Sequence, residues 1–123
     1  MSTLIASLST GKGTWVEVGR LISAQNWDKV FLITNKFGQD NFNPSANTEL
    51  IVLDSDNNDL TSLIKTIKDN LKGKISDFEV ALNFVSGSGK EHMALFEAVL
   101  ELGLNFRLVT FRNNQLEVLG IER

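Results

Sequence analysis

Short apolar runs alternate along this chain with segments whose apolar residues recur at helical spacing. Runs of strand length occupy residues 4–8, 29–34, 49–53, 78–84, 105–111 and 116–119. Helical spacing marks residues 14–25, 60–71 and 90–102. Strands that alternate with helices form mostly parallel sheets with helices on both faces. The pattern predicts an α/β fold.

The connections refine this prediction. Asn113-Asn114 is a tight-turn signal between the last two apolar runs and predicts a C-terminal β-hairpin. Residues 35–47 are polar and are expected to form a loop with room for a short helical turn. No repeat, linker or low-complexity tract interrupts the pattern. We therefore expect a single domain over residues 1–123, built as a Rossmann-like three-layer sandwich.

Two small, glycine-bearing turns follow strands, at residues 9–13 and 86–90. In parallel α/β sheets, ligands bind beyond the carboxyl ends of the strands, where the strand order reverses. If the first and fourth strands are neighbours, both turns face one crevice. The second turn, Ser86-Gly87-Ser88-Gly89-Lys90, opens a helix, and the unpaired N–H groups of a first helical turn attract anions. The sequence thus predicts a site for a phosphate-bearing ligand.

Two common nucleotide motifs are absent. Gly11 and Gly13 begin a dinucleotide fingerprint, but Val16 stands where its third glycine belongs, and the second strand ends in Thr34-Asn35 without an acidic residue. Gly89-Lys90 lacks the earlier glycine and the following Ser or Thr of a P-loop.

Several other polar and aromatic residues allow two interpretations each. His92 either lines the crevice or lies at the helix surface. The acidic cluster of Asp54, Asp56 and Asp59 favours helix capping over a weak cation site. Trp15 and Trp27 suit a core or a subunit interface, and Trp15 could instead stack on a base.

Composition excludes several classes of function. A net charge of -3, from 12 Lys and Arg against 15 Asp and Glu, argues against binding to long DNA or RNA. Cysteine is absent, which excludes disulfides and thiolate metal sites, and no metal or cofactor is expected. No apolar run approaches the roughly 20 residues of a membrane helix, and the start lacks the pattern of a secretory signal. We expect a cytoplasmic protein.

The turn at residues 86–90 resembles a signature of the CRISPR-associated Rossmann-fold (CARF) family: a strand, then Thr/Ser-Gly-Gly-Thr-Lys/Arg or a close variant, then a helix. A polar turn after the first strand, here Ser9-Thr10-Gly11-Lys12, is similar to the family's other signature. Asn83 stands near an Asp or Asn that often precedes the motif. The chain departs from the pattern at Ser88-Gly89, where Gly-Thr is commoner, and we expect no effector domain within these 123 residues. A stand-alone sensor, a stand-alone degrading enzyme and a domain of a longer chain all agree with this expectation.

The resemblance implies a homodimer that binds a cyclic oligoadenylate, the second messenger of type III CRISPR antiviral defence, in a cleft made by both turns of both subunits. It also implies that the chain could cut the ring slowly without metal, as a ring nuclease. Ser9 and Lys90 would be the catalytic residues. The ligand-binding residues would be Thr10, Gly11, Lys12, Asn83, Ser86, Gly87, Ser88, Gly89 and His92. The alternatives are a protein that binds another nucleotide or a sugar phosphate, and a regulatory module without a ligand.

Overall fold

The computed structural model describes residues 1–9 and 12–120. The elements follow one another as β1 (Thr3–Leu8), η1 (Lys12–Thr14), α1 (Trp15–Ser23), β2 (Lys29–Thr34), α2 (Lys36–Asn41), β3 (Thr48–Val52), α3 (Leu60–Leu71), β4 (Val80–Asn83), α4 (Gly89–Glu101), β5 (Phe106–Arg112) and β6 (Gln115–Val118). Strands and helices therefore alternate as the hydrophobic pattern predicts.

Within the described residues, the strands form a six-stranded sheet in the order β3-β2-β1-β4-β5-β6. All neighbours pair in parallel except β5 and β6, which form an antiparallel hairpin. The predicted α/β class, with a mostly parallel sheet and a C-terminal hairpin, is confirmed. The order reverses between β1 and β4, so the expected pairing of the first and fourth strands is also confirmed.

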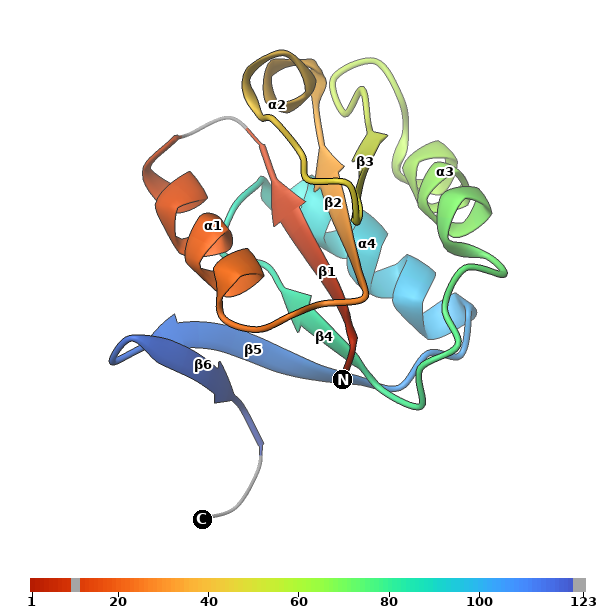
Figure 1. Ribbon diagram of the computed structural model, residues 1–123. Coiled ribbons are helices and arrows are strands. Elements are labelled where there is room, and N and C mark those ends of the chain that lie inside the picture. The colour runs from red at the N-terminus through yellow and green to blue at the C-terminus, as the bar shows by residue number, and fades with distance from the viewer. Residues whose placement is uncertain (10–11, 121–123) are drawn as a thin grey trace.

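Two apolar clusters bind the layers together. One cluster lies between the sheet and α3 and α4, and includes Ile5, Leu82 and Leu95. The other lies between the sheet and α1, and includes Leu21 and Trp27. Figure 1 shows α1 on one side of the sheet, α3 and α4 on the other, and the short α2 beyond the end of β2. The layers are those of a Rossmann-like sandwich.

The turns contain the residues that their backbones require. Asn113 and Asn114 both have positive φ, at 53° and 62°, which is the geometry of the tight hairpin turn predicted there. Asn35 caps α2 through a hydrogen bond that its side chain accepts from the Gly38 N–H. The predicted loop over 35–47 therefore does contain a short helix.

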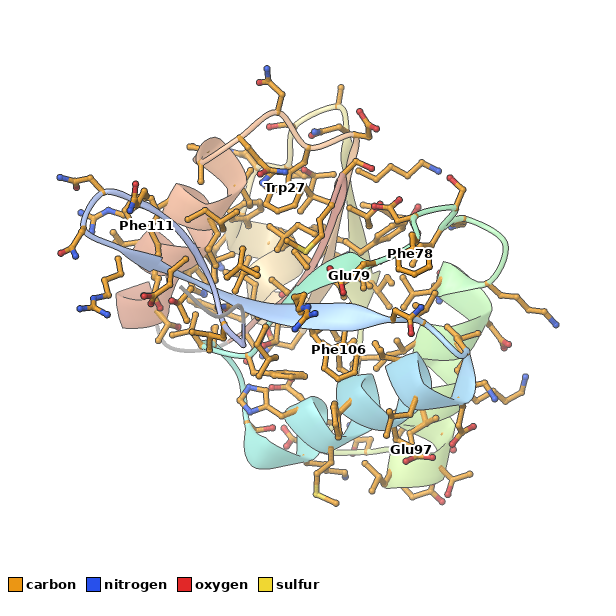
Figure 2. The ribbon with its side chains drawn as sticks, turned by 90° about the horizontal axis from the view of Figure 1, so that it is seen from below. Trp27, Phe78, Glu79, Glu97, Phe106 and Phe111 are labelled. Carbon is orange, nitrogen blue, oxygen red and sulfur yellow. The ribbon has the colours of Figure 1, made fainter. Side chains whose placement is uncertain are left out.

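Some predicted boundaries were too wide. The strand predicted over 78–84 pairs only at Val80–Asn83, and Phe78, which precedes it, is 87% exposed. The Phe106 side chain lies between β5 and α4 (Figure 2). Its ring centroid is 5.7 Å from that of Phe96 on α4. None of the helices in residues 1–9 and 12–120 combines the length and apolar character needed to cross a bilayer.

Asp77 anchors the start of β1. Its carboxylate accepts hydrogen bonds from the backbone N–H and the hydroxyl of both Ser2 and Thr3, at 2.8–3.0 Å. Partial burial raises the pKa of Asp77, but these hydrogen bonds from Thr3 and Ser2 outweigh it, so that the pKa lies below its ordinary value.

We predict that Asp77→Ala lowers the free energy of unfolding by about 1 kcal/mol at pH 7, because the carboxylate is only partly buried. A depressed folded-state pKa gives stability that is present above the unfolded value, about 3.9, and is lost as pH falls through the lower folded value. The difference from wild type should therefore shrink below about pH 4. Urea titrations followed by tryptophan fluorescence at pH 7 and pH 3 measure it, and a difference that persists at pH 3 would contradict this account.

Candidate functional site

The turns after β1 and β4 are in direct contact. Ala6 of β1 lies beside Asn83 of β4 in the parallel pairing of these strands, so the segments that follow β1 and β4 leave the sheet at the same edge. The Ser7 hydroxyl donates a hydrogen bond to the Ser86 carbonyl, and the Ser9 N–H donates to the Ser86 hydroxyl at 3.1 Å. Ser86 and Ser9 are both buried. The described part of the first turn is therefore fixed to the second turn.

A buried carboxylate, Glu91, joins a third segment to this pair. Its Oε1 accepts from the Ser9 hydroxyl at 3.0 Å and from the Ser88 N–H at 2.8 Å, and its Oε2 accepts from the Ser55 hydroxyl at 3.2 Å. The Ser88 hydroxyl accepts from the Glu91 N–H at 3.2 Å, which completes a capping box at the start of α4. Glu91 thus links the segments that follow β1, β3 and β4.

A pocket of about 750 Å³ lies at this edge of the sheet. Segments that follow four neighbouring strands line it: Ser9 after β1, residues 35–37 after β2, residues 52–56 from the end of β3, and Gly87, Ser88 and Glu91 after β4. Phe37 presents an aromatic ring that is 38% exposed. The pocket therefore lies beyond the carboxyl ends of the strands, beside the reversal of strand order, where ligands bind in such sheets.

The second turn has a backbone suited to an anion. Gly87 has a φ of +103°, and a Cβ added there would lie 3.1 Å from the Glu91 Oε1 and 3.4 Å from the Ser9 Oγ. The Ser88 N–H donates to the Glu91 carboxylate, so it is not available for the predicted hydrogen bond to a phosphate. The N–H groups of Gly87, Gly89 and Lys90 have no hydrogen-bond acceptor elsewhere in the described chain. The Gly87 N–H lies at the pocket, and the N–H groups of Gly89 and Lys90 follow it in the first turn of α4.

Three predicted site residues have structural contacts. The Lys90 ammonium donates to the carbonyls of Ser55 and Asn58, at 2.6 and 2.7 Å, so it ties α4 to the loop before α3. The His92 Nε2 lies 2.6 Å from the Ser86 carbonyl, which can only accept, so this nitrogen carries the proton. The Asn83 side chain donates to the Val109 carbonyl and accepts from the Val85 N–H. None of the three lines the pocket.

Part of the predicted first turn lies outside the described residues, namely Thr10 and Gly11. Lys12 begins η1. Ser9, Ser86, Gly87 and Ser88 do come together, and Gly89 is the first residue of α4. The structure thus assembles the core of the two predicted turns.

Trp27, Trp15 and Asp59, which the sequence left with two interpretations, each make structural contacts. Trp27 is buried in the core, and the Trp15 indole N–H donates to the Ser9 carbonyl at 2.7 Å while its ring lies 5.6 Å from that of Phe37. Asp59 caps α3 by accepting from the Ser62 N–H, and this hydrogen bond lowers the pKa of Asp59. No cluster of His, Asp and Glu within the described residues could hold a metal ion.

Sequence reasoning missed Lys36, Phe37, Ser55 and Glu91 as residues of the pocket. Glu91 had a signal, because Ser88-x-x-Glu91 has the spacing of a capping box. For the others, only the sheet order shows that their segments meet Ser9. Comparison with known protein families and with curated proteins gives no match to this chain.

Proposed function

We propose that this chain binds a cyclic oligoadenylate in the pocket beyond β1 and β4, and that it acts in type III CRISPR signalling in the cytoplasm, as its resemblance to the CARF family implies. One observation carries the proposal. Ser9 and the turn at residues 86–88, which hold the two signatures of that resemblance, are hydrogen-bonded to each other at the edge of one pocket.

The pocket offers suitable partners for the parts of an adenylate. The N–H groups of Gly87 and Gly89 would hold phosphate oxygens, with the positive end of the α4 dipole behind them. Lys36 lines the pocket, and its ammonium, which pairs with Asp40 at 3.1 Å, would turn to offset the phosphate charge. Phe37 would stack on an adenine base.

The proposal includes a homodimer. A ring with two-fold symmetry is best matched by a symmetric cleft between two copies of one chain. The outer face of α4 carries exposed apolar side chains, Met93, Phe96 and Leu100, that such a contact would cover. Analytical ultracentrifugation with and without the ligand reports this state.

Ring opening is a separable activity of the same site. Lys90 would have to leave the Ser55 and Asn58 carbonyls before it could stabilise charge on a phosphate. Cleavage would therefore depend mainly on positioning the ribose hydroxyl against the phosphate, and we expect it to be slow.

Lys36→Ala tests the proposal against a matched control. Lys36 pairs with Asp40 four residues along α2, and Lys65 pairs with Asp69 in the same way on α3, away from the pocket. Removing a charge-assisted contact costs roughly 1.5–3 kcal/mol, so Lys36→Ala should weaken binding of cyclic tetra- or hexa-adenylate by about 10- to 100-fold. Lys65→Ala should bind like wild type.

Isothermal titration with both rings, linear tetra-adenylate, AMP and ribose 5-phosphate measures these affinities. Tight binding of one ring alone supports the proposal. Tighter binding of AMP or ribose 5-phosphate would favour the alternative of a mononucleotide or sugar-phosphate site. No binding by any of these compounds would contradict the proposal.

A further inference from the structure

Glu91 occupies an unusual position for a charged residue. Its carboxylate lines the pocket, yet the residue is only 6% exposed. Burial of a carboxylate is costly unless hydrogen bonds replace its water. Here the replacement comes from Ser9, Ser55 and the Ser88 N–H.

These contacts fix the direction of two hydroxyl protons. A serine hydroxyl has one proton to donate and two lone pairs that accept. Because a carboxylate only accepts, the Ser9 and Ser55 protons both point at Glu91 and are not available to a ligand. Each hydroxyl then offers only lone pairs to anything bound beside it.

The pocket therefore has two chemically different sides. The side formed by Ser9, Ser55 and the carboxylates of Asp54 and Asp56 accepts hydrogen bonds. The side formed by Lys36 and the Gly87 N–H donates them. A phosphate oxygen suits only the donating side, whereas a ribose hydroxyl or an amino group suits the accepting side.

We propose that Glu91 is a positioning residue, which holds the Ser9 and Ser55 hydroxyls as acceptors so that this side of the pocket selects ligands with ribose hydroxyl groups. The inference rests on the proposed function, since it assigns the sugar of the same ligand to one wall of the same pocket. It also gives Ser9 a defined role, as the acceptor of a ribose 2′-hydroxyl proton.

The first test compares cyclic tetra-adenylate with its 2′-deoxy counterpart, or the hexa-adenylate pair if that ring binds better. Wild type should prefer the ribose ring by about tenfold, the value of one buried hydrogen bond. Ser9→Ala should bring the preference close to one. Deoxyribose also changes the shape of the free ring, but that effect is the same for both proteins and cancels when their preferences are compared.

A pair of Glu91 variants separates positioning from folding. In Glu91→Gln, the amide oxygen must face the Ser88 N–H, which can only donate, so it still accepts from Ser9. The amide nitrogen then takes the place of Oε2 and donates to the Ser55 hydroxyl, so this variant releases Ser55 and keeps Ser9, the residue assigned to the ribose 2′-hydroxyl. Glutamine also serves in a capping box, so the start of α4 is kept. Glu91→Gln should therefore retain the ribose preference, whereas Glu91→Ala frees the Ser9 proton and should lose most of it.

The possible results distinguish a failure of the role assigned to Glu91 from a failure of the proposed function. If wild type binds neither form of the ring, the proposed function fails. If it binds both forms equally, or if Ser9→Ala keeps the wild-type preference, the proposed function stands and the inference is overturned. Loss of the preference in Glu91→Gln, with an unchanged melting temperature, would also overturn it. Should Glu91→Ala not fold, the Ser9→Ala and Glu91→Gln titrations decide.

Discussion

Replacing Gly87 with alanine should destabilise the protein by roughly 1–3 kcal/mol and weaken ligand binding with it. The φ of +103° is one that residues with a Cβ rarely adopt. The new methyl group would also press on three functional atoms, the Glu91 Oε1 at 3.1 Å, the His92 Nε2 at 3.3 Å and the Ser9 Oγ at 3.4 Å. Relief of the unfavourable φ or of these close contacts has to move the turn that lines the pocket.

Gly89→Ala is the matched control, two residues further along the same turn. Gly89 begins α4 without positive φ, and a Cβ added there meets nothing within 4 Å. Alanine is about 1 kcal/mol better than glycine inside a helix, so this variant should be as stable as wild type or slightly more so. Thermal unfolding of both variants gives the comparison, and equal stability of Gly87→Ala and wild type would refute the strained geometry assigned to the turn.

Asn83→Ala should have a larger effect on stability, roughly 2–4 kcal/mol, since it leaves one buried carbonyl and one partly buried N–H of the backbone without their side-chain partner. The Asn83 amide donates to the Val109 carbonyl at 2.7 Å, and its oxygen accepts from the Val85 N–H at 3.0 Å. Asn83 and Val109 are 3% and 1% exposed, so water cannot replace the contact between them without opening the sheet between β4 and β5. Urea unfolding followed by circular dichroism measures the loss.

Asn105→Ala controls for the loss of an asparagine near the same strands. Asn105 is exposed, and its side chain makes one long hydrogen bond, 3.3 Å, to the Phe78 carbonyl. Its removal should change stability by about 0.5 kcal/mol or less. An Asn83→Ala protein that keeps its stability but loses affinity would mean that Asn83 serves the ligand, as its place in the motif predicts, and not the fold.

The arrangement of the sheet was predictable because it follows from patterns a few residues long. The continuous apolar run Val30-Phe31-Leu32-Ile33 is typical of a strand buried on both faces. The helical stripe through Leu63, Ile67 and Leu71 does lie in the core. Alternation of such segments favours parallel crossovers, and a doubly wound strand order, if present, would put the turn after β1 beside the turn after β4; the observed strand order has this arrangement.

The contents of the site depend on distances that no local pattern encodes. Lys90 stands in the expected motif, but the carbonyls that hold it belong to the loop before α3, more than thirty residues earlier in the chain. Ser88 was recognisable as a cap, whereas the contact between Glu91 and Ser9 depends on the packing of β4 against β1. The limits of β4 likewise depend on pairing, because Phe78 and Phe84 are apolar enough to extend the strand but lie beyond its partners.

The most direct measurement of the central claim is an amide chemical-shift titration of the 123-residue protein with cyclic tetra- and hexa-adenylate. A pocket formed by the turns after β1 and β4 predicts that the largest shifts fall on the N–H groups of Ser9, Gly87, Gly89 and Lys90, with smaller ones at Phe37 and Ser55. Shifts confined to the opposite end of the sheet, around Asp28 and Lys74, or no shifts with either ring, would contradict the account.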